Sequence, residues 1–146
     1  MLQHREIRIL PHSPDKMFDL VADIERYPEF LPWCKDAEIV SRVKGKVVAD
    51  LVIGYKIFEE KFTSEVQFKR PRSITVNYRS GPLSHLSNVW EFRPAANGGC
   101  EVLFEVGFDF KSPFLRAAMT LFFDKALARL SSAFEDRARA VYGQSV

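Results

Sequence analysis

The sequence predicts an α+β fold in which an antiparallel sheet of about six or seven strands wraps around one long C-terminal helix. Between residues 36 and 110, apolar and polar side chains alternate with the two-residue period of half-buried strands. From residue 113 to about residue 142, apolar side chains recur at three- and four-residue steps, as on one face of a helix. Short turn signals join the predicted strands, which favours an antiparallel meander with one face in water.

The composition is that of a single globular domain spanning residues 1–146. Hydrophobic residues make up 47% of the chain and charged residues 27%, and the net charge of +2 is too small to indicate DNA as a partner. Cys34 and Cys100 are far apart and lack a disulfide or metal motif. No apolar run approaches the roughly 20 residues of a membrane span, and the first ten residues do not resemble a signal peptide. We expect a cytoplasmic protein, with a peripheral position at the inner face of the membrane left open.

The first predicted elements are a strand and one or two short helices after it. Residues 3–10 favour a strand with Ile7 and Ile9 on one face. Ser13-Pro14-Asp15 then supplies a capping hydroxyl, a proline at the first helical position and an acid at the positive end of the helix dipole. We expect this helix to end before Pro28.

The segment from Tyr27 to Cys34 is the most informative part of the chain. It contains three aromatic residues, a leucine and two prolines within eight residues. Proline fixes its own backbone and restricts the residue before it, so the segment is a rigid connector and not simply more helix. A rigid apolar connector is unfavourable in water, and we therefore interpret it as the lip of a binding cavity.

The strands that follow place mostly apolar side chains on their inner face. In residues 58–69, polar side chains occupy the odd positions, and phenylalanines and a valine occupy most even positions. By this alternation Glu60, Ser64 and Asn88 also point inward. A buried carboxylate or amide needs a partner, which a neighbouring side chain, water or a ligand's polar head would supply. The alternative is a β-bulge that turns Glu60 outward.

The last predicted helix runs without a break for about 30 residues, or about 45 Å. Its apolar stripe continues from Phe123 to Val141, but its first turns, residues 114–123, are apolar around nearly the whole circumference. One sheet covers one side only, so the other side needs the aromatic connector, a ligand, a partner or a membrane surface. Arg116 and Lys125 would contact anionic headgroups, whereas a helix end well buried against residues 27–34 is the alternative.

The order of strand, helix, aromatic connector, antiparallel sheet and long terminal helix resembles the helix-grip, or START-like, fold. The stretch from Val21 to Cys34, VADIERYPEFLPWC, resembles the signature of the coenzyme Q-binding START-domain family. That family lies within the polyketide cyclase/dehydrase and lipid-transport superfamily and includes the bacterial ribosome-association toxins. Gly81-Pro82-Leu83 stands where the toxin branch often has glycine-proline-phenylalanine, a difference too small to separate the branches. Other similar segments extend the resemblance over nearly the whole chain: 60–64, 90–92 and 133–138.

The resemblance implies a protein that binds and chaperones ubiquinone, or a related isoprenoid lipid, between the sheet and the long helix in support of respiration. Ubiquinone would be a non-covalent ligand, and a membrane surface would be a transient partner. The ligand would contact side chains of the connector, the inner sheet face and the start of the last helix: Phe30, Leu31, Trp33, Glu60, Phe62, Tyr78, Asn88, Trp90, Phe108, Met119, Phe122 and Phe123.

Two other functions stay open on the sequence alone. A ribosome-association toxin-type protein would bind a ribosomal subunit, and basic residues in the turn at 69–72 and on the last helix favour it, although acids are interleaved with them. An aromatase/cyclase-type enzyme would need an acid–base pair, for which Glu60 and His85 are the candidates. We expect a binding protein, not an enzyme, with neither a catalytic residue nor a metal site.

Overall fold

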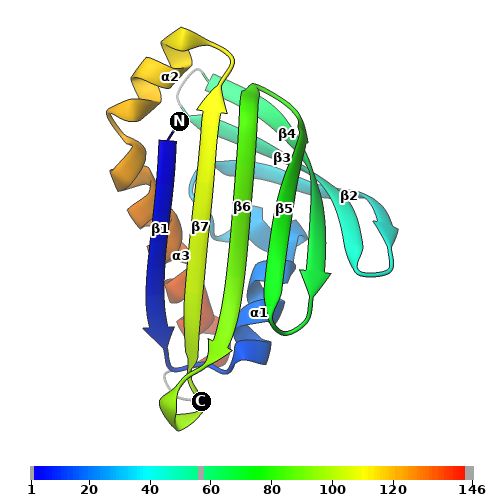
Figure 1. Cartoon of the computed structure of the whole chain (residues 1–146), viewed down its shortest axis with the longest axis vertical. Helices are drawn as coiled ribbons and strands as arrows, with labels where there is room; N and C mark the ends of the chain where they lie inside the picture. Colours follow the sequence, from blue (N-terminus) through cyan, green and yellow to red (C-terminus); the bar gives the residue numbers. More distant parts are fainter. Residues whose placement is uncertain (1, 56–57, 144–146) are drawn as a thin grey trace.

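The computed structural model describes residues 2–55 and 58–143 and shows the expected α+β arrangement (Figure 1). The described residues form one antiparallel sheet of seven strands in the order β1-β7-β6-β5-β4-β3-β2, which curves around the C-terminal helix. The strands are β1 (Leu2–Leu10), β2 (Cys34–Val43), β3 (Lys46–Tyr55), β4 (Phe58–Lys69), β5 (Ser73–Ser80), β6 (Leu83–Pro94) and β7 (Cys100–Phe110).

The first strand completes the sheet at the side of the last strand. β1 pairs antiparallel with β7 along its whole length, from Leu2 opposite Phe108 to Leu10 opposite Cys100. Leu10 is buried, whereas Ile7 and Ile9 share the outer face and are exposed. The prediction that these two isoleucines lie on one face is therefore confirmed, and that face is turned away from the core.

The first helix, α1 (Pro14–Ala22), begins at the predicted signal. The Ser13 hydroxyl accepts a hydrogen bond from the backbone N–H of Lys16 at 3.2 Å, and Pro14 stands at the first helical position. α1 ends before Pro28, as expected. The connector prediction was incomplete, because a 3₁₀-helix, η1 (Ile24–Glu29), continues through Pro28. Proline fits there because its fixed φ is compatible with a helical turn.

The last helical segment is two helices and not one, so the prediction of an unbroken helix was wrong. α2 (Pro113–Thr120) ends where the Thr120 hydroxyl donates to the Arg116 carbonyl at 2.8 Å, a contact that bends helices. The N–H of Phe122 then bonds to the Met119 carbonyl three residues back, at 3.1 Å, and Phe122 leaves helical geometry at φ −117° and ψ 0°. α3 (Phe123–Tyr142) follows and packs on the sheet.

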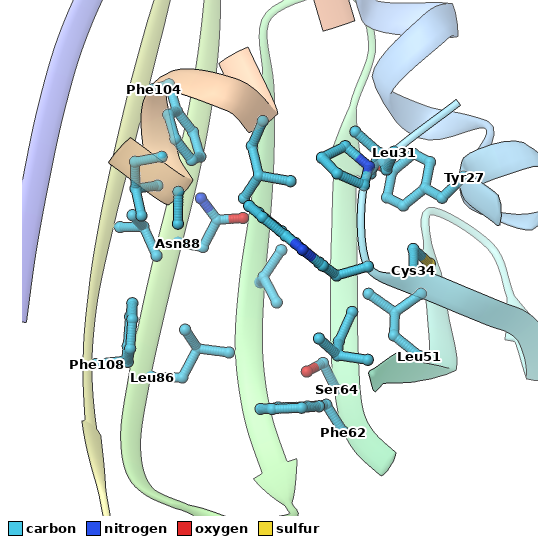
Figure 2. A pocket seen from close by; sticks show the side chains of 18 of the residues that line it. Tyr27, Leu31, Cys34, Leu51, Phe62, Ser64, Leu86, Asn88, Phe104 and Phe108 are labelled. Carbon is cyan, nitrogen blue, oxygen red and sulfur yellow. The ribbon is translucent and has the colours of Figure 1, made fainter. Parts of the chain in front are cut away.

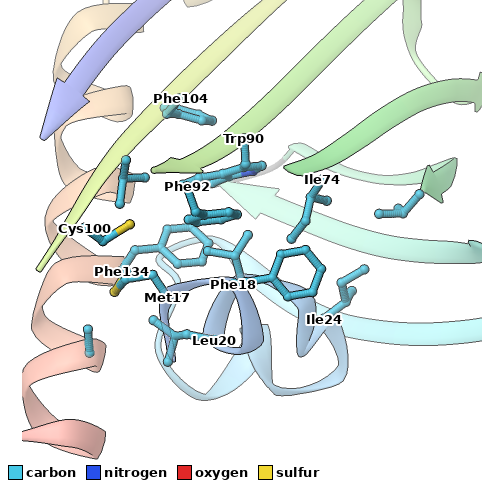
Figure 3. Packing of buried hydrophobic residues seen from close by; sticks show 14 of the residues in the cluster. Met17, Phe18, Leu20, Ile24, Ile74, Trp90, Phe92, Cys100, Phe104 and Phe134 are labelled. Carbon is cyan, nitrogen blue, oxygen red and sulfur yellow. The ribbon is translucent and has the colours of Figure 1, made fainter. Parts of the chain in front are cut away.

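The core fills one end of the space between the sheet and α3. There α1 packs Met17, Phe18 and Leu20 against the sheet and α3 (Figure 3). The Phe18 ring meets the Phe92 ring edge-on at 5.8 Å between centroids. α1 lies at this end of the sheet and α2 at the other (Figure 1). A short 3₁₀ turn, η2 (Ala96–Gly98), joins β6 to β7.

Candidate ligand-binding cavity

A cavity of about 520 Å³ lies between the sheet and α3, on the side of the core that faces α2. Its volume falls within the range of about 300–1,000 Å³ that is usual for small-molecule sites. Figure 2 shows side chains from several strands and from the connector pointing into it. The apolar side chains on the wall include Val21, Ile24, Leu51, Ile53, Phe62, Val76, Leu83, Leu86, Trp90, Phe104, Val106, Phe108 and Phe110.

The aromatic connector forms one wall, with Tyr27, Leu31, Pro32 and Trp33 among its lining residues. The Tyr27 hydroxyl donates to the Val21 carbonyl, and burial raises the pKa of Tyr27 far above its ordinary value. Trp33 has φ of 67°, a backbone region that non-glycine residues seldom occupy. The Arg129 guanidinium lies 5.5 Å from the centroid of the Trp33 ring. The connector is thus tied to α3 at the cavity mouth.

The sheet wall carries the predicted residues Phe62, Asn88, Trp90 and Phe108. Ser64 lines it as well and is 9% exposed, which agrees with its expected inward direction. Polar groups on this wall are therefore few and lie among aromatic and aliphatic side chains.

The helical wall combines apolar residues with two cations. Met119 and Phe122 line the cavity, as expected, and so do Ser131, Lys125 and Arg129. The Ser131 hydroxyl donates to Glu6 Oε1 on β1, which joins α3 to the edge strand. Lys125 and Arg129 are exposed, so they mark the mouth and not the interior.

Four predicted contact residues, Phe30, Glu60, Tyr78 and Phe123, lie outside the cavity wall. Phe30 packs edge-on against Phe134 at 5.4 Å between centroids, and the Arg137 guanidinium lies over the Phe30 ring at 5.0 Å from its centroid. Tyr78 accepts a hydrogen bond through its hydroxyl from the Leu83 backbone N–H at 3.0 Å, which closes the β5–β6 turn. Phe123 is buried in the core against Phe108.

Glu60 is exposed, so the expected buried carboxylate is not present. It pairs with Ile53 in a β3–β4 register without a shift and therefore shares the face of Phe62, which excludes the bulge alternative for this pairing. The position along the strand was the error, since Glu60 lies beyond the part of β4 that lines the cavity. His85 is exposed too and does not line the cavity, so the acid–base pair of the enzyme alternative is not assembled there.

Several lining residues were missed by the sequence reading. Ala49, Leu51 and Ile53 alternate along β3, and this period-two signal was sufficient to find them. Ser131 and Arg129 gave no such signal, because a serine and an arginine on a helix are read as solvated.

The two cysteines are buried thiols. Burial raises the pKa of both Cys34 and Cys100 to about 11, so each stays protonated near neutral pH. Because the thiolate is the nucleophile, these residues are poor candidates for covalent chemistry. Among the helices of the described residues, none has the length and apolar character that a membrane crossing requires.

Comparisons with known proteins place this geometry in a family. Residues 10–135 match the family described as polyketide cyclase / dehydrase and lipid transport. Ribosome association toxin RatA from Rickettsia prowazekii is 38% identical, over 97% of this chain and 99% of that protein. Coenzyme Q-binding protein COQ10 homolog B, mitochondrial, from Xenopus laevis is 32% identical over 98% of this chain, which spans 60% of that protein.

A solved structure gives the same fold at low identity. The Zhui aromatase/cyclase from Streptomyces sp. R1128 aligns with a TM-score of 0.84 over 99% of each chain, at 15% identity, which shows the fold alone. The chain therefore belongs to the polyketide cyclase / dehydrase and lipid transport family and has its START-like fold.

Proposed function

We propose that this protein binds ubiquinone, or a closely related isoprenoid lipid, in the cavity and chaperones it in support of respiratory electron transport. The observation that carries the proposal is the cavity itself, about 520 Å³ with aromatic and aliphatic walls between the sheet and α3. The relative named as a coenzyme Q-binding protein supports the choice of ligand.

The cavity wall suits an amphipathic ligand, because it is mostly apolar and carries a few polar side chains. Burying an isoprenoid tail contributes about 25 cal/mol for each Å² of apolar surface removed from water. Ser64 and Asn88 place polar groups among the apolar side chains, and a few such groups are what orients a ligand in an apolar site.

The surface around the mouth favours transfer at a membrane. On α2 and the bend after it, Phe114 is 79% exposed, Leu121 80% and Phe122 51%. Lys125 and Arg129 at the mouth form no ion pair with any residue in the described part of the chain. Arg116, which the sequence also suggested as a headgroup contact, is paired with Asp109 at 3.0 Å. We propose weak, reversible docking of this surface on anionic bilayers.

The proposed ligand is tested by extraction and titration. Organic extracts of protein purified without detergent should contain ubiquinone above the level in an identically expressed control, and added ubiquinone should quench the fluorescence of Trp33 and Trp90. A Val76→Trp variant, which fills the cavity, should lose the bound lipid, whereas Val40→Trp on the exposed face of β2 should keep it. A clean extract together with unchanged fluorescence contradicts the proposal.

Ribosome association is the second candidate, because a relative named as a ribosome association toxin covers nearly the whole chain. Two of the basic residues that suggested it are engaged in ion pairs: Arg70 with Asp19 at 2.8 Å and Arg137 with Glu29 at 2.8 Å. Sedimentation of the protein with ribosomal subunits through a sucrose gradient decides this candidate, and cosedimentation that persists in the Val76→Trp variant would separate it from lipid binding.

Catalysis is not part of the proposal. The two curated relatives described above are named for binding or association, and the aromatase/cyclase shares the fold at an identity too low to carry its activity.

A further inference from the structure

The polar side chains on the cavity wall have a defined hydrogen-bonding direction, and this direction constrains the ligand. Asn88 on β6 donates from Nδ2 to the backbone carbonyl of Glu105 at 2.8 Å. Because a backbone carbonyl can only accept, the amide nitrogen must face β7 and the amide oxygen is left for the cavity. Figure 2 shows this oxygen turned toward the middle of the cavity. Asn88 therefore offers a ligand a hydrogen-bond acceptor.

Trp90 offers the opposite group from the same strand. It lies two residues after Asn88 on the same face, is 8% exposed and lines the cavity. Its indole N–H makes no hydrogen bond to any residue within 2–55 and 58–143. An indole N–H donates and cannot accept, so the group that pairs with it must be an acceptor.

Ser64 faces these residues from β4. Its hydroxyl, on a side chain that is 9% exposed, is also without a hydrogen-bond partner among the described residues. Asn88 pairs with Val76, which pairs with Val66, two residues from Ser64. Two strand spacings of about 4.8 Å and an offset of about 7 Å therefore place Ser64 and Asn88 about 12 Å apart at Cα. Both side chains turn their polar atoms toward the space between them, which suits a ring with oxygens on opposite edges (Figure 2).

We propose that the cavity recognises an aromatic ring bearing hydroxyl groups, and that it prefers a quinol over the corresponding quinone. This inference rests on the proposed function and specifies the head of its ligand. A phenolic hydroxyl donates to Asn88 Oδ1 and accepts from the indole N–H of Trp90. A quinone carbonyl accepts only, so it satisfies Trp90 and leaves Asn88 Oδ1 without a donor. The Ser64 hydroxyl both donates and accepts, so it can hydrogen-bond to the oxygen on the opposite edge of the ring in either the quinone or the quinol.

The charges of the wall agree with an uncharged head. The cations Lys125 and Arg129 lie at the mouth, and the lining residues that the structure describes include no aspartate or glutamate. A neutral quinol is compatible with this interior, whereas a carboxylate or phosphate head would remain at the mouth.

The test compares the two redox forms of one short-tailed ligand. The full chain is titrated with decylubiquinone and with decylubiquinol under nitrogen, and the dissociation constants are measured by calorimetry. Wild type should bind the quinol about three- to tenfold more tightly, which is the effect of one additional net hydrogen bond. Asn88→Leu should reduce this ratio to near one. Trp90→Phe should weaken the binding of both forms by a similar factor, because both present an acceptor.

The control is Asn77→Leu, the same substitution at an exposed position of β5 opposite Ser87, and it should leave the ratio unchanged. Equal binding of the two forms by wild type, or tighter binding of the quinone, overturns this inference and leaves the proposed function intact. A preference that survives Asn88→Leu also overturns it. Binding of neither form overturns the proposed function as well. If Asn88→Leu does not fold, the wild-type ratio and the Trp90→Phe variant decide the question.

Discussion

The two ends of the layer between the sheet and α3 differ in what closes them. At one end α1 places Met17, Phe18 and Val21 on the sheet, and these side chains are almost fully buried. At the other end none of the residues of α2, all of which the structure describes, is buried, and the space beneath is a cavity. Both ends use the same strands. The cavity therefore exists because a helix, α1, fills the space between the sheet and α3 at one end only.

The largest expected difference between the ends is in stability. Phe18→Ala removes a buried ring from the closed end and should lower the free energy of unfolding by about 3–5 kcal/mol. Phe114→Ala at the open end removes a ring that is 79% exposed and should change it by no more than about 0.5 kcal/mol. Urea denaturation of both variants measures this contrast. Similar losses in the two variants would mean that α2 also contributes to the folded core.

Removing the N-cap of each helix should also have different effects on stability at the two ends, but the difference should be smaller. Ser13→Ala removes the cap of packed α1 and should cost about 1 kcal/mol of global stability. Ser112 caps α2 through the N–H of Leu115 at 3.3 Å, so Ser112→Ala should speed amide exchange in α2 and leave the melting temperature nearly unchanged. Hydrogen–deuterium exchange and thermal melting test the pair. An equal loss of melting temperature in the Ser13→Ala and Ser112→Ala variants would mean that α2 does not open locally while the rest of the fold stays intact.

The exposed residues of the open end should act on membranes and not on folding. Leu121→Ser combined with Phe122→Ser should reduce the fraction of protein that floats with anionic liposomes and slow quinone transfer between vesicles. Ile7→Ser combined with Ile9→Ser, on the exposed outer sheet face, is the matched control and should do neither. Wild-type flotation and transfer in a folded Leu121/Phe122 double variant would refute the docking surface.

The smallest expected effect is a pH dependence at the closed end. His12 is buried against the Tyr142 ring, and burial, with Lys16 and Arg139 nearby, lowers the pKa of His12. The unfolded state then binds more protons between the lowered value and 6.5, so stability should fall as pH drops through this interval. Melting temperatures from pH 7 to pH 5 should show a shallower decline in His12→Gln. An unchanged slope in that variant would assign the effect to other groups.

Elements with strong local signals were predictable from the sequence. The Ser13-Pro14 cap, the alternation along β4 and the stripe that begins at Phe123 each follow from a short stretch of residues, and the structure has all three. The break after Thr120 was not predictable in this way. It depends on a hydroxyl that bonds to a carbonyl four residues back, and many helices carry such a threonine without breaking.

For the candidate site, the sequence predicted which face of the sheet a side chain occupies better than how far along each strand the cavity extends. Period-two alternation states which face a side chain occupies, and it placed Phe62, Asn88 and Trp90 on the inner face correctly. It does not state how far along a strand the cavity extends, and for that reason Glu60 and Tyr78 were assigned to the wall. Depth depends on which helices cover the sheet, and this is a property of tertiary packing.

The pairing of β1 with β7 has a consequence for how the chain folds. The strand made first must wait for a partner about one hundred positions later, since Leu2 lies opposite Phe108. Contacts between residues so distant in sequence bring slow folding, on the order of milliseconds to seconds for sheet-rich domains. During synthesis the apolar inner face of the nascent meander would be exposed until α3 emerges, and such intermediates are prone to aggregation. The chain is therefore expected to depend on rapid completion of its C-terminal helix, or on chaperones, to reach the native state.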